Sequence, residues 1–190
     1  TLNGGTGGDT LLGEDGDDVL LGSSGRDTLD GGDGNDTIEG GLGQDVIFGG
    51  AGDDVILAGA ESDTVDGGAG NDTVIYDFAS TALSNLSLTG SAGAGWSLKS
   101  GADTLLGFAR LSDGALQVSD LRSGSALGVD VLKNIESLSL VFTTADSTGR
   151  YVADIGVDST STTTTLSLKV LQNYIVGTSA GEVITGTGAA

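Results

Sequence analysis

Residues 4–75 read GGTGGDTLL-GEDGDDVLL-GSSGRDTLD-GGDGNDTIE-GGLGQDVIF-GGAGDDVIL-AGAESDTVD-GGAGNDTVI, a nine-residue unit repeated eight times without insertion or deletion. A branched aliphatic residue occupies the eighth position of every unit. The sixth position is always aspartate: Asp9, Asp18, Asp27, Asp36, Asp45, Asp54, Asp63 and Asp72. A short fixed period decides the architecture, because each unit must bury its apolar side against other units.

The unit divides into a loop and a short strand. Positions one, two and four are mostly glycine, which adopts positive φ without steric cost and lets a loop turn its carbonyl oxygens inward. Positions seven to nine favour an extended strand whose middle side chain points to one face. Two units then complete one coil, so units i and i+2 stack about 4.8 Å apart. The predicted apolar stacks are Leu11, Leu29, Ile47 and Val65 on one side, and Leu20, Ile38, Ile56 and Val74 on the other.

The same stacking places the position-six carboxylates in two columns. Like charges about 5 Å apart repel by roughly 3 kcal/mol per pair at an effective dielectric near 20. A core this thin cannot offset that repulsion, so cations must lie between successive turns. Carboxylate and carbonyl oxygens, in a chain without His or Cys, select Ca²⁺ over transition metals, and flexible loops suit Ca²⁺ better than Mg²⁺.

The unit resembles the GGxGxDxUx nonapeptide of RTX proteins, the hemolysin-type calcium-binding repeat family. The resemblance implies an all-β fold, a right-handed parallel β-roll (a β-helix solenoid) followed by a β-rich capping region. It also implies that the eight position-six aspartates, with loop carbonyl oxygens, hold each calcium ion between units i and i+2. Pairing odd units with odd and even with even gives six complete sites, with half-sites at the open ends.

Three units depart from the family pattern. Unit 7 has Ala58 at position one and Glu61 at position four, where glycine is expected, so the site between units 5 and 7 should be the weakest. Units 2 and 3 carry Glu14 and Ser23 at position two, a milder departure. The remaining loop acids are expected to be solvated charges, or to contribute through their carbonyl groups, rather than primary ligands: Asp15, Asp17, Asp33 and Asp53.

The charge distribution excludes several classes of partner. Residues 1–78 hold 18 acidic residues and one basic residue, Arg26, out of 27 and 7 in the whole chain. Such a surface repels nucleic acid and anionic lipid. The lack of His and Cys removes Ser-His-Asp catalysis, imidazole zinc sites and disulfides. No apolar run reaches the ~20 residues of a membrane span, and no basic-then-apolar signal peptide opens the chain. The absence of an initial Met suggests a piece of a longer protein.

Residues 79–172 are predicted to form a β-rich capping flank, with strands near residues 86–88, 96–98, 138–142, 151–155 and 166–170, and a surface loop at 158–165. Two segments of this flank are similar at an offset of 27 residues: GADTL from Gly101 and GVDVL from Gly128. Family resemblance implies that such segments continue or cap the roll. Capping is the favoured role for Asp103 and Asp130, with metal ligation as the alternative. Residues 173–190 resemble the start of a following block, so the predicted domains are 1–78, 79–172 and 173–190.

The predicted function is a non-enzymatic, calcium-binding structural module that folds on Ca²⁺ binding after secretion. The resemblance implies a large extracellular or cell-surface bacterial protein, exported by type I secretion machinery, such as an adhesin, a surface-layer protein or a toxin. A non-catalytic β-roll domain of a secreted protease, lipase or epimerase is the alternative, and residues 79–172 could bind a receptor or surface. A disordered Gly/Asp-rich linker is the other alternative. The unbroken nine-residue period argues against disorder when calcium is bound, whereas the calcium-free array is expected to be disordered.

Overall fold

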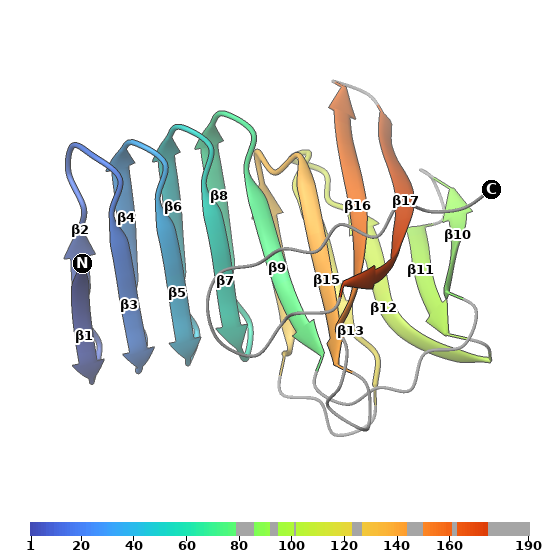
Figure 1. Ribbon diagram of the computed structural model, residues 1–190, viewed down its shortest axis with the longest axis horizontal. Helices are drawn as coiled ribbons and strands as arrows, with labels where there is room; N and C mark the ends of the chain where they lie inside the picture. The colour runs from blue at the N-terminus through green and yellow to red at the C-terminus, as the bar shows by residue number, and fades with distance from the viewer. Residues whose placement is uncertain are drawn as a thin grey trace.

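The computed structural model describes residues 1–78, 86–91, 95–100, 102–122, 127–143, 150–160 and 163–174. All regular structure in this described part of the chain is β-strand. The strands form two sheets that run the length of the molecule, with the roll at one end and a broader antiparallel region at the other (Figure 1). The described part contains no helical segment with the length and hydropathy needed to span a membrane.

The roll is a parallel β-solenoid of about four turns in which the chain alternates between the two sheets. Sheet A receives β1 (Leu2–Thr6), β3 (Val19–Ser24), β5 (Thr37–Leu42), β7 (Val55–Ala60) and β9 (Thr73–Phe78). Sheet B receives β2 (Thr10–Leu12), β4 (Thr28–Asp33), β6 (Val46–Ala51) and β8 (Thr64–Ala69). From β3 onward each strand has six residues rather than the predicted three, because the first residues of the next unit also join the ladder, as in the pairing of Gly41 with Gly59.

Both predicted apolar stacks are confirmed by the strand register. On sheet A, Leu20 pairs with Ile38, Ile38 with Ile56, and Ile56 with Val74. On sheet B, Leu11 pairs with Leu29, and the stack continues through Ile47 to Val65. All of these side chains except Leu11, which is half-buried at the open end, are fully buried. Each contributes about 1.5–3 kcal/mol of hydrophobic stabilisation.

The chain leaves the roll after Phe78 and returns to it at Gly128. Between these points, β10 (Leu86–Ser91), β11 (Gly95–Ser100), β12 (Asp103–Arg110) and β13 (Leu116–Asp120) form an antiparallel extension of sheet B. Then β14 (Val129–Lys133) pairs antiparallel with β13 on one side and parallel with β8 on the other. Residue Leu132 therefore continues the stack above Val65.

Sheet A is extended in a similar way. Strand β15 (Ser137–Thr143) pairs parallel with β9 and places Leu138 beside Val74, and β16 (Arg150–Thr160) and β17 (Thr163–Tyr174) follow antiparallel. The strands predicted in the flank are present, but the predicted loop at 158–165 is wrong. Residues 158–160 pair with 163–165 at the end of a long hairpin, since β-branched Thr favours strands. Residues 175–190, which hold most of the segment predicted to start a second block, lie outside the described residues.

One apolar core passes from the roll into the flank without interruption. Beyond Val74 it includes Phe78, Leu106, Leu138 and Leu140, all nearly or fully buried. Trp96, partly buried, packs against this core. The open face at the end of the solenoid is thus covered by β14 and β15, which pair parallel with the roll, and by the antiparallel strands beyond them.

Candidate metal centre

The position-six aspartates line the two edges of the roll, where the chain turns from one sheet to the other. We call the loops at residues 4–9, 22–27, 40–45 and 58–63 the odd edge, and those at 13–18, 31–36, 49–54 and 67–72 the even edge. Asp9 and Asp18, in the first turn, are half-buried. The other six are at most 1% exposed: Asp27, Asp36, Asp45, Asp54, Asp63 and Asp72. The structure therefore brings the eight predicted residues together as two inner columns.

From the second turn onward, one oxygen of each position-six carboxylate is fixed by the backbone of the preceding turn. The N–H of Asp18 donates to Oδ1 of Asp36 at 2.7 Å, and the N–H of Asp36 donates to Oδ1 of Asp54 at 2.8 Å. The odd edge repeats this ladder, for example from the N–H of Asp45 to Oδ1 of Asp63 at 2.9 Å. These charge-assisted bonds hold six of the eight carboxylates, those of Asp27, Asp36, Asp45, Asp54, Asp63 and Asp72, in one orientation inside the loop.

The second oxygen of these carboxylates has no donor. Oδ2 is buried without a hydrogen-bond partner in seven of the eight aspartates: Asp9, Asp27, Asp36, Asp45, Asp54, Asp63 and Asp72. Leaving a buried polar atom unpaired costs about 1–3 kcal/mol, and more when the group is charged. A partner from outside the chain would relieve this cost at all seven oxygens.

The position-one glycines form a cradle around these oxygens. A Cβ added to Gly22 would lie 2.8 Å from Oδ2 of Asp27 and 2.5 Å from the carbonyl oxygen of Gly40, one turn later. At Gly31 the same clash involves Oδ2 of Asp36 and the carbonyl oxygen of Gly49. A carboxylate oxygen and a carbonyl oxygen of successive turns thus converge on the space that a side chain would fill.

The donor set fits Ca²⁺. The described residues contain no group of three acidic side chains that could hold a metal by themselves, so carbonyl oxygens must complete any site. A mixture of carboxylate and carbonyl oxygens, without nitrogen or sulfur, is what Ca²⁺ prefers. The residues present therefore fit the metal that the sequence predicted.

Burial raises the pKa of several carboxyl groups in the columns. Desolvation is the largest cause in each case, and the neighbouring acids of the column add to it. It raises the pKa of Asp54 to about 6 and that of Asp63 to about 7, and it also raises those of Asp45 and Asp72. The backbone N–H bond to Oδ1 opposes this shift without cancelling it. Without a cation, the interior thus disfavours the charged form of these groups.

The flank adds a fifth member to each column: Asp130, for which the sequence gave metal ligation only as the alternative to capping, and Glu136, which the sequence did not predict. Asp130 is 2% exposed, and its Oδ1 accepts the N–H of Asp63 at 3.0 Å. On the even edge, Oε2 of Glu136 accepts the N–H of Asp72 at 2.9 Å. Asp130 and Glu136 therefore repeat the position-six interaction one turn beyond the array.

The ninth unit is split by the excursion of residues 79–127. A Cβ on Gly128 would clash with the carbonyl oxygen of Glu61, the contact that position-four glycines make with the preceding turn. Its φ is +68°, as position four requires. Gly128 and Asp130 thus serve as positions four and six of a unit that begins at Tyr76. In the sequence, the GVDVL segment from Gly128 was the only sign of this ninth unit. The similar GADTL segment from Gly101 does not belong to the roll, and the sequence alone could not show which of the two does.

The two similar flank segments have different environments. Asp103 is exposed at the start of the antiparallel strand β12, away from the columns, whereas Asp130 lies inside one. The similarity of the two segments therefore reflects shared strand preference and not a shared site.

Asp130 differs from the other buried column members in having a partner on its second oxygen. The hydroxyl of Tyr76, 3% exposed, donates to Oδ2 of Asp130 at 2.8 Å. Desolvation, with the nearby carboxylate of Asp130, raises the pKa of Tyr76 well above its ordinary value, so the phenol keeps its proton. Desolvation also raises the pKa of Asp130 to about 6.

The irregular units adopt the backbone of the regular ones. Glu61, at position four, has φ of +82°, while Glu14 and Ser23, at position two, have +68° and +77°. Glycine occupies both positions in the other units and has positive φ at each described case. Unit 7 therefore keeps the loop shape at a cost in backbone strain, and the weakness of the site between units 5 and 7 stays a prediction.

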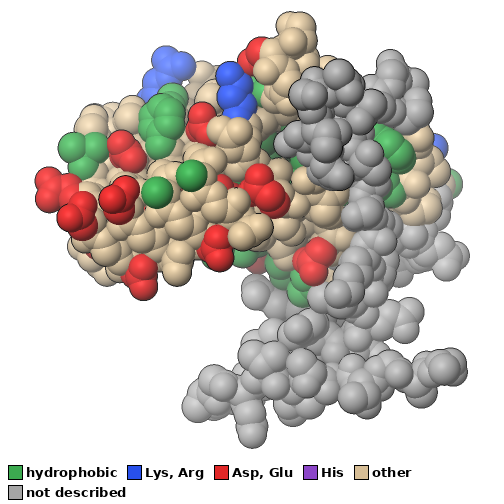
Figure 2. Space-filling model, turned by 90° about the horizontal axis from the view of Figure 1, so that it is seen from above, with side chains coloured by type: hydrophobic (Ala, Val, Ile, Leu, Met, Phe, Trp, Pro, Cys, Tyr) green, Lys and Arg blue, Asp and Glu red, His purple; other side chains and the backbone are tan. Residues whose placement is uncertain are grey.

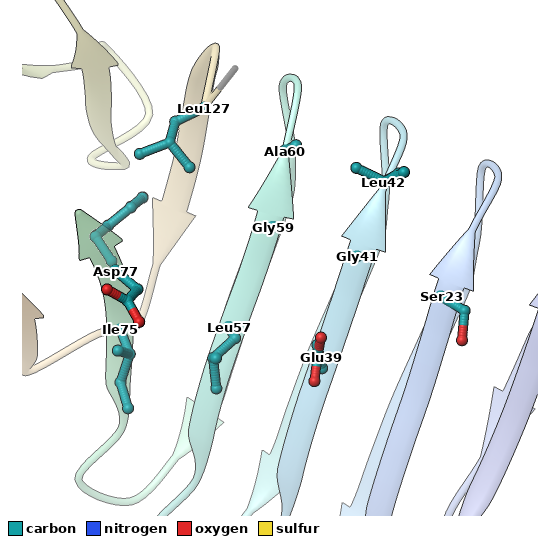
Figure 3. A pocket seen from close by; sticks show the side chains of 11 residues that line it. Ser23, Glu39, Gly41, Leu42, Leu57, Gly59, Ala60, Ile75, Asp77 and Leu127 are labelled. Atoms are coloured by element: carbon teal, nitrogen blue, oxygen red, sulfur yellow. The ribbon is translucent and has the colours of Figure 1, made fainter. Parts of the chain in front are cut away.

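A separate groove of about 390 Å³ lies on the outer face of sheet A. Its floor contains Gly41 and Gly59, and Leu42, Leu57 and Leu127 line it together with acidic residues such as Glu39 (Figure 3). Glu39 and Leu57 stand side by side on neighbouring strands. The groove is mainly apolar and is distinct from the carboxylate columns, which lie at the edges of the roll.

Comparison with known families agrees with the geometry. The family model described as "RTX calcium-binding nonapeptide repeat (4 copies)" matches residues 1–29, 12–47 and 39–74. Residues 1–74 are RTX calcium-binding repeats. The RTX array of this chain is a calcium-binding structural module, and its β-roll is not a catalytic fold. Neither the curated proteins nor the solved structures contain a match to the chain.

Proposed function

We propose that the eight position-six aspartates ligate calcium between successive turns of the same edge, together with loop carbonyl oxygens. The observation that carries the proposal is the set of seven buried Oδ2 atoms without a donor. In the six aspartates beyond the first turn, Oδ1 already accepts a backbone N–H, so Oδ2 is the oxygen available to a cation. Six sites follow from the pairing of units, three on each edge.

Calcium would supply the positive charge that the columns lack. The buried carboxylates of one edge stack turn upon turn, and no Lys or Arg pairs with the six buried position-six aspartates among the described ion pairs. The thin core of one aliphatic residue per unit cannot offset that repulsion. Binding of the metal and folding of the array are then linked, because the unfolded chain has no preformed site.

We further propose that the chain belongs to a secreted or cell-surface bacterial protein. RTX repeats are typical of secreted bacterial proteins. A module that folds only with calcium suits export in an unfolded state, because calcium is scarce in the cytosol and roughly millimolar outside, within the range of weak extracellular sites. The parent would be an adhesin, a surface-layer protein or a toxin that leaves by type I secretion. The array would act as a folding switch and a rigid spacer.

The proposed domain organisation assigns residues 1–78 to the calcium-binding roll and residues 79–172 to a flank that caps it. The parallel pairing of β14 and β15 with the roll supports the capping role. Residues 173–190 are proposed as the start of a following block on their sequence alone.

The test is far-UV circular dichroism of the full chain, freed of metal and titrated with calcium, with magnesium as the control. We expect a coil-like spectrum that changes to a β spectrum on calcium addition, and a much smaller response to magnesium. A spectrum that ignores both calcium and chelator would overturn the proposal.

A further inference from the structure

The loops of the even edge carry a second ladder of side chains, on their outer surface, at position five. The N–H of Asn35 donates to Oδ1 of Asp17 at 2.8 Å, and the N–H of Asp53 donates to Oδ1 of Asn35 at 2.7 Å. The N–H of Asn71 then donates to Oδ1 of Asp53 at 2.8 Å. All four side chains are exposed. This outer ladder runs in the opposite direction to the inner one, because each donor lies one turn after its acceptor.

The ladder does not need the charges that it carries. Asn35 accepts the same bond in the same geometry as Asp17 and Asp53, so a neutral amide serves as well as a carboxylate. The alternation of Asp and Asn keeps like charges two turns apart and limits their repulsion. The two carboxylates therefore add negative charge to this edge beyond what the hydrogen bonds require.

The odd edge lacks this feature. Its position-five residues are Gly8, Arg26, Gln44 and Ser62, and no such ladder joins them among the described hydrogen bonds. Apart from the position-six residues, its loops hold one exposed acid, Glu61, and one exposed base, Arg26.

The even-edge loops instead hold five exposed acids and no base. These acids are Glu14, Asp15, Asp17, Asp33 and Asp53. Figure 2 looks onto this edge and shows acidic side chains gathered over the N-terminal half of the roll. The inner columns of the two edges are built alike up to their last members, Asp130 and Glu136, so the outer charges are the main electrostatic difference along the array.

We propose that the even edge binds calcium more tightly than the odd edge, and that Asp17 and Asp53 are affinity-determining residues of its sites. The inference rests on the proposed calcium function. Both edges supply the buried oxygens that a cation needs, since Oδ2 lacks a donor in Asp36, Asp54 and Asp72 on the even edge as it does on the odd edge. An exposed acid roughly one Debye length from a divalent ion, in water and at physiological salt, strengthens binding by about twofold.

The proposal separates charge from hydrogen bonding through Asp→Asn changes. In D17N/D53N the outer ladder keeps its acceptors, because Asn35 already plays this part in the native chain. The matched control is D30N/E39Q, which removes two acids from position nine, on the faces of the sheets rather than at an edge. Both variants change the net charge by the same amount.

The experiment is calcium binding to the full chain by equilibrium dialysis at two ionic strengths. We expect two classes of sites, and D17N/D53N should weaken the tighter class by about fourfold at low salt and less at high salt. The control should change it by less than twofold. D36N should remove ions from the tighter class, and D45N from the weaker one.

Three results would contradict the inference. A single class of sites, an effect of D17N/D53N no larger than that of the control, or a tighter class that depends on Asp45 rather than Asp36 would overturn it while calcium binding itself persists. Absence of calcium binding by the native chain would instead overturn the proposed function.

Discussion

The hydroxyl of Tyr76 donates a hydrogen bond to Oδ2 of Asp130 at 2.8 Å, in the interior of the last turn of the roll. In seven aspartates of the array the corresponding oxygen has no donor. Tyr76 stands at position one of the split ninth unit, where the regular units have glycine and an open cradle. The Tyr76 hydroxyl thus supplies a donor to the carboxylate oxygen that has none in the regular units.

We expect Tyr76→Phe to destabilise the calcium-loaded protein by roughly 1–3 kcal/mol, the cost of leaving a buried acceptor unsatisfied. Chemical denaturation in saturating calcium, followed by circular dichroism, measures this change. The control is the same substitution in an Asp130→Ala background, where the acceptor is already absent. If Tyr76→Phe costs as much there as in the native chain, the hydroxyl does not act through Asp130.

A comparison of one array aspartate, Asp36, with one flank aspartate, Asp103, provides a second prediction. Asp36→Ala should lower stability by roughly 1–3 kcal/mol through the lost bond to the N–H of Asp18 alone, and should raise the calcium midpoint about tenfold or more. Asp103→Ala should change neither quantity, because Asp103 is exposed and outside the columns. Calcium titrations of both variants by circular dichroism measure these effects. Equal loss of bound calcium in both would show that the flank ligates metal at Asp103.

The repeat period was sufficient to predict the roll and its register. Position eight of every unit is aliphatic, so the pairing of Leu29 with Ile47 and of Ile38 with Ile56 follows from stacking alternate units. The position-six aspartates follow from the same phase, because a rigid period places equivalent side chains above one another.

The period could not predict what happens after Phe78. The excursion of residues 79–127 has no nine-residue phase, so nothing in the sequence shows that Gly128 and Asp130 complete the unit begun at Tyr76. The outer ladder was also missed, since the roles of Asp17 and Asp53 depend on backbone N–H groups one turn away. Contacts between distant segments and bonds to the backbone leave little trace in a residue pattern.

Unit 7 provides a third prediction, on backbone strain. Glu61 has φ of +82°, a conformation that costs a residue with a side chain about 1–2 kcal/mol relative to glycine. Glu61→Gly should therefore stabilise the calcium-loaded protein by about 0.5–1 kcal/mol, after subtraction of the entropy that glycine gains in the unfolded chain. Thermal unfolding in saturating calcium tests this. Glu61→Gln removes the charge but keeps the strain, and an equal gain in that variant would assign the effect to charge instead.

The raised pKa values of the column carboxyl groups predict that protonation at low pH stabilises the folded array in part, as calcium does at neutral pH. Burial raises the pKa of Asp54 to about 6 and that of Asp63 to about 7, above the ordinary value of 3.8. A carboxyl group with a higher pKa in the folded state binds its proton more tightly there, so protonation favours folding. This stabilisation is complete below about pH 4 and is lost as the pH rises through 6 to 7.

The chain, freed of calcium on a chelating resin, should thus show more β-structure near pH 4–5 than at pH 8, and saturating calcium should largely remove this difference. Far-UV circular dichroism between pH 4 and 8, with and without calcium, measures both effects. The variant Asp63→Asn is neutral at every pH, so its calcium-free form should gain less structure on acidification than the native chain. A metal-free protein that is equally unfolded at pH 4.5 and pH 8, or better folded at pH 8, would show that carboxylate repulsion is not what calcium relieves.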